Sequence, residues 1–193
     1  MKLIEFEKLR LTEKFVVAEC VEELKKDGHV LMIPWGGSYV VAGGWLDTKA
    51  RDNIYKVRKS RLCQMFHWDF EDCLKHGLRF SRPARKLAVK LCPAPLTIID
   101  NEDGGSEIAF QIPAGPSMIH DILEGYGLPI AIAGTGKNIG RDALASLFSH
   151  PDLAVDMGTV QDPVVSTVVE LKNGQVKILR QGAVKESAIR DAL

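Results

Sequence analysis

Long apolar segments are missing from this chain of 193 residues, and so is any net charge. No stretch approaches the roughly 20 consecutive apolar residues that a membrane-spanning helix needs. The first seven residues are too acidic, and their apolar run too short, for a signal peptide. The 25 Lys and Arg residues equal the 25 Asp and Glu residues in number. We therefore expect a cytoplasmic protein without a membrane partner.

Paired cysteines are also missing, because none of the four cysteines belongs to a Cys-x-x-Cys pair. Scattered cysteines are typical of reduced thiols in a cytosolic protein. One short window does hold two cysteines and two histidines: Cys63, His67, Cys73 and His76. Such a set could bind zinc, but neither pair has the zinc-finger spacing. The neighbouring Phe66 and Trp68 favour packed core, so we expect no metal site.

The basic residues are unevenly distributed along the chain. Residues 49–90 contain 12 Lys or Arg and four Asp or Glu, a local excess of 12 − 4 = 8 positive charges. Such a segment suggests an anionic partner, for example a nucleotide or an RNA backbone. A pair of well-solvated helices would have the same composition, and the sequence leaves both interpretations open.

Apolar spacing, cap residues and turn residues predict an alternation of helices and strands. The predicted helices cover residues 12–27, 48–61, 81–91, 117–125 and 140–148. The predicted strands cover residues 29–33, 39–42, 96–99, 107–112, 129–133 and 153–156, with Pro34 breaking the first, and residues 62–80 should hold a strand and a short helix. This mixture predicts a single-domain α/β protein with a mixed sheet.

The last third of the chain contains a clear hairpin pattern. Two β-branched runs flank Asn173-Gly174, and these two residues readily adopt the positive φ angles of a type I′ turn. Ser166 and Thr167 stand at the start of the first strand and Arg180 at the end of the second. Two hydroxyls and a guanidinium could together bind a phosphate or a carboxylate. They could equally be ordinary strand residues and a solvated strand end.

Residues 166–171 and 178–183 read Ser-Thr-Val-Val-Glu-Leu and Ile-Leu-Arg-Gln-Gly-Ala. This order resembles the C-terminal signature of the YrdC/YciO family, which includes the threonylcarbamoyl-AMP synthases of tRNA modification. Lys56 and Arg58 match a Lys-x-Arg of the family, and residues 93–97 match its proline-rich approach to a strand. The resemblance extends over residues 12–183 and implies a twisted, open mixed sheet flanked by helices.

Two segments depart from the family pattern. Gln111 stands where the family has an arginine, so it cannot supply a full positive charge. Residues 34–41 lack most of the polar side chains of the family's threonine-binding signature, and Trp35 with two glycines should make an apolar, roomier pocket. The glycine-rich loop at residues 134–138 occupies the place of a Ser-Ala-Asn element and keeps Asn138. It is not a Walker A loop, because Asn138 replaces the magnesium-binding Ser or Thr.

The resemblance implies a YrdC-like domain at residues 8–184, followed by a C-terminal tail at residues 185–193. It implies a nucleotidyltransferase that converts ATP, carried with Mg²⁺, L-threonine and bicarbonate to threonylcarbamoyl-adenylate. Lys56, Arg58 and Arg180 would then neutralise phosphate or carboxylate charge. The residues expected to donate hydrogen bonds to the nucleotide are Ser166, Thr167 and Asn138.

Two alternatives to this function stay open. One is a catalytically impaired relative that binds a nucleotide, tRNA or double-stranded RNA through the same basic groove. The other is an enzyme that activates a different small carboxylate, an idea prompted by the altered residues 34–39. No catalytic residue is assigned from the sequence.

Overall fold

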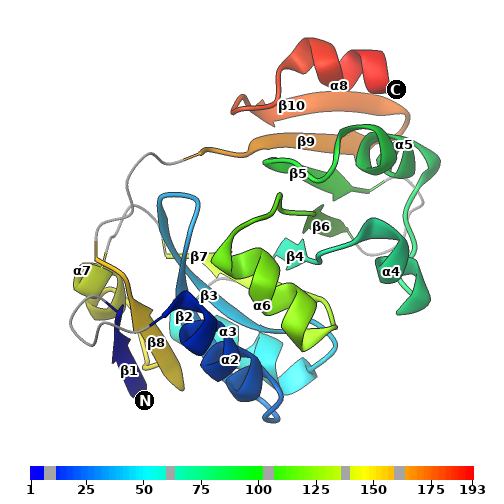
Figure 1. Cartoon of the computed structure of the whole chain (residues 1–193). Helices are drawn as coiled ribbons and strands as arrows, with labels where there is room; N and C mark the ends of the chain where they lie inside the picture. Colours follow the sequence, from blue (N-terminus) through cyan, green and yellow to red (C-terminus); the bar gives the residue numbers. More distant parts are fainter. Residues whose placement is uncertain (7–11, 60–63, 102–106, 136–139, 159–163) are drawn as a thin grey trace.

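The computed structural model describes residues 1–6, 12–59, 64–101, 107–135, 140–158 and 164–193. Its strands are β1 (Lys2–Glu5), β2 (Val30–Trp35), β3 (Ser38–Gly44), β4 (Gln64–Phe66), β5 (Leu96–Asp100), β6 (Ile108–Gln111), β7 (Ile130–Gly134), β8 (Leu153–Asp156), β9 (Thr167–Lys172) and β10 (Gln175–Arg180). These strands form one sheet in the order β1-β8-β2-β3-β7-β4-β6-β5-β9-β10 (Figure 1). It contains both parallel and antiparallel pairs, so the predicted single-domain α/β fold with a mixed sheet is confirmed.

The helices flank this sheet. They are α2 (Glu13–Leu24), α3 (Thr48–Arg58), α4 (Phe70–Lys75), α5 (Arg82–Leu91), α6 (Met118–Tyr126), α7 (Gly140–Ala145) and α8 (Glu186–Ala192). No helix within the described ranges is long and apolar enough to cross a membrane.

Side-chain caps fix where five of the described helices begin. Each cap side chain accepts a hydrogen bond from the backbone N–H three residues further on, which satisfies a donor that the helix itself leaves unpaired; the caps are Thr12, Asp47, Asp69, Ser81 and Ser117. The helices predicted at residues 12–27, 48–61, 81–91 and 117–125 begin at or next to four of these caps. Helix α3 is shorter than predicted, because Lys59 adopts a left-handed conformation with φ of 53° and ends it.

The first hairpin corrects the prediction that Pro34 breaks its strand. Strand β2 continues through Pro34 and Trp35, which lie opposite Tyr39 and Ser38 of β3. On its other side β2 pairs with β8 only at Leu31 and Met32, so proline's missing N–H removes no ladder hydrogen bond there. The residues that follow Trp35 make the turn, with φ of 58° at Gly36 and 81° at Gly37.

The second hairpin, β9–β10, has the predicted turn. Asn173 has φ of 53° and Gly174 has φ of 72°, both in the left-handed region. The register of β10 shifts between Ile178 and Arg180, so that Arg180 lies opposite Val168. Such an irregularity bends a strand and redirects its side chains. It therefore affects the direction of the Arg180 side chain at the end of β10.

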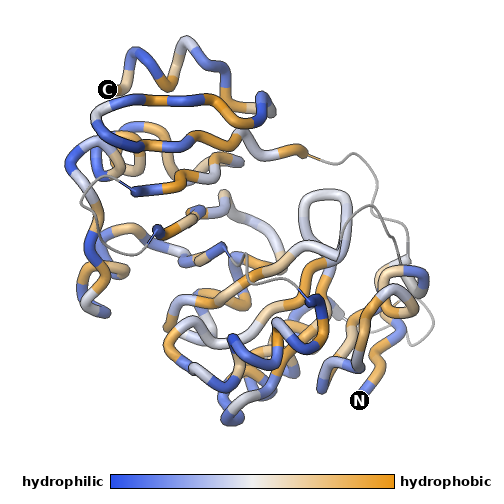
Figure 2. The backbone as a smooth tube through the Cα atoms, turned by 180° about the vertical axis from the view of Figure 1, so that it is seen from behind, coloured by the Kyte–Doolittle hydropathy of each residue, from blue (hydrophilic) through white to orange (hydrophobic). Residues whose placement is uncertain are grey.

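One half of the sheet is covered on both faces. Leu31 and Ile33 of β2 pack into a core formed with α2 and α6, whereas Val30 packs into a smaller core under α3. Burial on both faces explains why the β2 sequence is a continuous apolar run instead of an alternating one. Figure 2 shows this run of hydrophobic residues along the strands, with polar residues on the helices that cover them.

The other half of the sheet packs its apolar side chains against α4, α5 and α8. Leu96 and Ile98 of β5 and Phe110 of β6 point into this second core and are fully buried. The side chains of the residues next to them in sequence therefore point to the opposite face of the same strands. Those residues include Thr97 of β5 and Gln111 of β6, which line the cavity described below.

Two terminal elements were not predicted from the sequence. Strand β1 pairs in parallel with β8 and extends the sheet at its edge. Residues 185–193, expected as a C-terminal tail, contain α8, which contacts α5 and buries Ile189 and Ala192. Both elements are short, four and seven residues, so neither shows a periodic pattern long enough to recognise.

Candidate functional site

Two cavities lie between the first hairpin and the segment that leads into β9. Their volumes are about 290 and about 220 Å³. They share four lining residues: Trp35, Gly36, Gln111 and Val164. In Figure 1 the β2–β3 turn reaches toward the segment before β9, and a Cβ atom at Gly36 would lie 3.8 Å from the backbone oxygen of Val164. The two cavities therefore form one continuous candidate site.

One wall of the site is the turn between β2 and β3, residues 35–38, here called the Trp35 turn. The larger cavity is lined mostly by this turn and by apolar residues, including Pro95, Ala114 and Val164. The Trp35 ring packs edge-on against Phe66, with ring centroids 5.5 Å apart. This wall offers surface for an apolar or planar group and no charge of its own.

The opposite wall, here called the Arg180 wall, consists of Val164, Val165, Ser166 and Arg180, which all line the smaller cavity. Nε of Arg180 donates a hydrogen bond to the backbone oxygen of Ser166 at 3.0 Å. This bond ties the end of β10 to the residue just before β9. Among the described residues that line either cavity, Arg180 is the one cation.

Between the walls lies a buried polar floor centred on Gln111, whose side chain is 1% exposed. Its Oε1 accepts hydrogen bonds from Thr97 Oγ1 and Ser166 Oγ, both at 3.1 Å. Its Nε2 has no hydrogen-bond partner among the described residues. A buried donor without a partner is costly and usually marks a place where a ligand or water completes the site.

Thr167 performs a different task from its neighbour Ser166. It is fully buried, and its Oγ1 donates to the backbone oxygen of Val184 at 2.7 Å. Thr167 Oγ1 also accepts hydrogen bonds from the backbone N–H groups of Gly182 at 2.9 Å and Val184 at 3.1 Å. This hydroxyl thus holds residues 182–184 against β9, directly behind the Arg180 wall. Its contact with a nucleotide stays a prediction.

The two cations of α3 lie in different places. Arg58 is the last residue of the helix, and its Nε donates to the backbone oxygen of Gly134 at 2.8 Å. Gly134 lines the smaller cavity, so Arg58 stands at its rim. Lys56 lies on the exposed side of α3, where its Nζ donates to Asn53 Oδ1 at 2.9 Å. Asn138, the remaining predicted ligand residue, lies outside the described residues.

The basic segment at residues 49–90 is divided by the fold. Helix α3 packs against β3 and β7, whereas α5 packs against β5 and α8. The two basic helices therefore cover separate parts of the sheet. Several of their cations already have partners in the protein, such as Lys49 with Asp27 and Lys86 with the backbone oxygen of Leu193.

The sequence predicted Ser166 and Arg180 as site residues and singled out Trp35 and Gln111 as departures from the family pattern. It did not assign Gln64 or Thr97 to the site. Thr97 Oγ1 lies 3.3 Å from Gln64 Oε1 and 3.1 Å from Gln111 Oε1, and its one proton can go to either, so all three belong to one polar cluster. The available signal was a polar residue within an otherwise apolar strand. A polar residue in a strand can be assigned to a site only when the order of the strands shows which other polar residues lie next to it.

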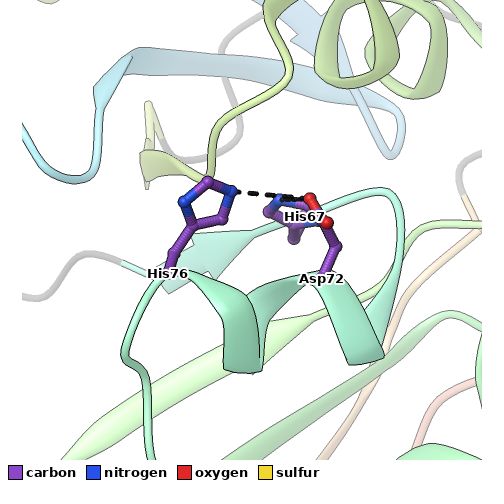
Figure 3. A group of neighbouring side chains, drawn as sticks. All are labelled: His67, Asp72 and His76. Carbon is purple, nitrogen blue, oxygen red and sulfur yellow. Dashed lines mark ion pairs between the residues drawn. The ribbon is translucent and has the colours of Figure 1, made fainter.

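A second group of polar side chains lies outside this site, at the end of β4 and along α4. Figure 3 shows the His67 ring against the Asp72 carboxylate, with His76 reaching toward the same carboxylate. Asp72 Oδ2 is 3.4 Å from His67 Nε2 and 3.5 Å from His76 Nε2. Cys73 is not part of this group: its Sγ donates to the backbone oxygen of Asp69, and burial raises the pKa of its thiol to about 12. Cys63, the other cysteine of this window, lies outside the described residues.

Comparison with known proteins gives one family. The Sua5/YciO/YrdC family model, described as "Telomere recombination", matches residues 23–182. No curated protein sequence matches the chain.

Solved structures with the same fold include three informative ones. Sua5 from P. abyssi, complexed with L-threonine, has a TM-score of 0.75 and 18% identity, over 100% of this chain and 60% of that one. E. coli YciO has a TM-score of 0.71 and 16% identity, over 97% of each chain. HypF in a phosphate- and nucleotide-bound form has a TM-score of 0.64 and 16% identity, over 88% of this chain and 29% of that one. This chain thus spans about the length of YciO but only part of Sua5 and HypF.

Proposed function

This chain belongs to the Sua5/YciO/YrdC family, and we propose that it uses ATP to activate a small carboxylate in the site between the Trp35 turn and the Arg180 wall. L-threonine is the first candidate, because the similar Sua5 structure is complexed with it. With threonine and bicarbonate, the amine and bicarbonate condense to a carbamate with loss of water. A carbamate oxygen then attacks the α-phosphate of ATP, which gives threonylcarbamoyl-adenylate and releases pyrophosphate.

The observation that carries this proposal is the position of Arg180. Its side chain lines the smaller cavity, and its Nε is held by the backbone oxygen of Ser166. The two terminal nitrogens are then the atoms that would meet an anion, and an arginine binds phosphate or carboxylate through two parallel hydrogen bonds. Ser166 and Gln111 lie beside it as uncharged hydrogen-bonding groups.

Such a site would act by positioning and by electrostatics. Holding the carbamate next to the α-phosphate of ATP converts a bimolecular step into an effectively unimolecular one. A cation fixed in place before reaction stabilises the negative charge that builds up as pyrophosphate leaves. Arg180 is proposed for that role, with Arg58 at the rim of the cavity as a second cation.

Magnesium fits this site only as part of the nucleotide. The described residues that line the two cavities include no carboxylate, the side chain that Mg²⁺ prefers in proteins. We therefore expect Mg²⁺ to be held by the phosphates of ATP, where it neutralises part of their charge.

The test is pyrophosphate release from ATP, with and without L-threonine and bicarbonate. We expect release to require both, and Arg180→Ala to reduce it by about 100-fold, the usual effect of removing a preorganised electrostatic group. Lys177→Ala is the matched control, since it removes the same charge from an exposed position on the same strand. Unchanged turnover in Arg180→Ala would contradict the assignment, and Arg180→Lys should retain part of the activity.

A second candidate function is favoured by Gln111. An uncharged side chain at the centre of the floor suits a relative that binds a nucleotide or RNA without catalysing the reaction. In that case ATP should bind without threonine-dependent turnover. Affinity for double-stranded RNA or tRNA, if present, should fall steeply with salt because phosphate neutralisation releases counterions.

A further inference from the structure

The histidines on either side of Asp72 offer a second site, separate from the nucleotide cavity. His67 directly follows β4, whereas Asp72 and His76 belong to α4 or its C-terminal cap. Their three ligand atoms all lie within 4.8 Å of one another. Figure 3 shows both imidazole rings next to the Asp72 carboxylate.

The spacing of these atoms is that of a metal site. Zinc bonds to histidine and carboxylate ligands are about 2.0–2.1 Å long, which places neighbouring atoms of a tetrahedron about 3.3–3.4 Å apart. Asp72 Oδ2 lies 3.4 Å from His67 Nε2 and 3.5 Å from His76 Nε2. These two distances match a tetrahedral site, and the third pair of ligand atoms, the two imidazole nitrogens, also lies within 4.8 Å.

His67 provides an independent indication. Its side chain is fully buried, yet its Nε2 has no hydrogen-bond partner among the described residues. Asp72 directs its other oxygen, Oδ1, to Lys75 at 2.9 Å, which leaves Oδ2 facing both histidines.

We propose that His67 Nε2, Asp72 Oδ2 and His76 Nε2 bind a divalent transition-metal ion, with Zn²⁺ as the best match to two imidazoles and one carboxylate. His76 is 24% exposed and Asp72 15%, so water can occupy the fourth position. The ion would join the end of β4 to α4. This metal-site proposal does not depend on the function proposed for the site between the Trp35 turn and the Arg180 wall.

Zinc binding has one structural cost that provides a specific readout. Asp69 N donates a hydrogen bond to His67 Nδ1 at 3.1 Å, which places the ring proton on Nε2. The ion must displace that proton, so the ring takes its proton on Nδ1 and the bond from Asp69 is lost. One lost hydrogen bond is small beside the binding of zinc by three protein ligands. The Asp69 amide resonance should therefore shift when zinc binds.

The test uses the full chain after treatment with a chelator, titrated with Zn²⁺ by calorimetry. We expect binding of one ion and a melting midpoint raised by about 5 °C at excess zinc. His76→Ala and Asp72→Asn should each weaken binding by at least 10- to 100-fold, since even residues that only orient metal ligands have effects of about that size. His120→Ala is the matched control, because His120 lies in the other, more exposed histidine and carboxylate group.

The outcomes separate the possible sites. Loss of binding in His120→Ala, equal affinity in wild type and His76→Ala, or no binding at micromolar zinc would each overturn the proposal. A thiolate charge-transfer band with Co²⁺ would assign the ion to cysteines instead and would overturn it too. A shift of the Asp69 amide on adding zinc, absent in His76→Ala, would support it.

Discussion

The two walls of the candidate site differ in how firmly the protein fixes them. Behind the Arg180 wall, the buried hydroxyl of Thr167 makes three hydrogen bonds. A Cβ atom at Gly182 would lie 2.3 Å from the backbone oxygen of Val165, so the backbones are in close contact there. At the Trp35 turn, a Cβ atom at Gly36 would meet nothing closer than 3.8 Å. One wall is tightly packed and the other is open.

This difference separates two kinds of information in the chain. The packed wall coincides with the sequence that resembles the family, because its residues are needed to build the fold as well as the site. The open wall is where the chain departs from the family, since few contacts restrict it. We therefore expect changes in the Arg180 wall to affect stability and changes in the Trp35 turn to affect the ligand.

The largest effect should come from Gly182→Ala. The added methyl group would collide with the backbone of residues 165–167, which cannot move without disturbing the start of β9. We expect a loss of about 3 kcal/mol or more in the free energy of unfolding, measured by urea denaturation. Gly134→Ala is the control, because nothing lies within 4 Å of its Cβ position, and it should change stability by less than about 0.5 kcal/mol.

Thr167→Val should have the next largest effect. Valine keeps the shape but leaves the oxygen of Val184 and the amides of Gly182 and Val184 without their partner. The expected loss is about 2–3 kcal/mol in the same assay. Ser166→Ala, which removes one hydroxyl with a single described hydrogen bond to Gln111, should cost about 1 kcal/mol. Equal losses in the two variants would contradict the special role of Thr167.

Gln111→Arg tests the floor between the walls. It restores the charge that the family pattern has at this position, so affinity for a small carboxylate should rise about tenfold, the effect of a charge-assisted hydrogen bond. Because the position is 1% exposed, the same change should lower stability by about 1–3 kcal/mol. Gln111→Leu, measured in parallel, should lose stability without the gain in affinity.

Trp35→Ala should have the smallest effect on stability. The ring is half-buried and packs edge-on against Phe66, so we expect a loss of about 1 kcal/mol. The KM for the small carboxylate should change more than the Kd for ATP, because the larger cavity lies at this turn. Trp45→Ala is the control: its ring contacts Arg51 away from the cavity and should leave KM unchanged.

The sequence predicted most of the fold, because long periodic segments and helix caps are local signals. It identified the β9–β10 hairpin from Asn173-Gly174 and the start of α2 from Thr12. It was wrong about Pro34, since a proline breaks a strand only where a neighbouring strand needs a backbone N–H at that position. It missed β1, whose partner β8 lies about 150 residues further along the chain.

The site was harder to predict for the same reason. Ser166 and Arg180 belong to one hairpin, so their proximity followed from local pairing. Gln111, Thr97 and Gln64 come from three strands and meet only through the order of the sheet. The different tasks of the neighbours Ser166 and Thr167 follow from the alternation of strand side chains between two faces, one toward the cavity and one toward residues 182–184.

The most direct test of the account is a crystal structure with a non-hydrolysable ATP analogue and L-threonine bound. We predict the phosphates beside Arg180 and Ser166, and the small acid between Gln111 and the Trp35 turn. Ligands bound instead over the exposed face of α3 or along α5, with the cavity between the two walls unchanged, would contradict the central claim.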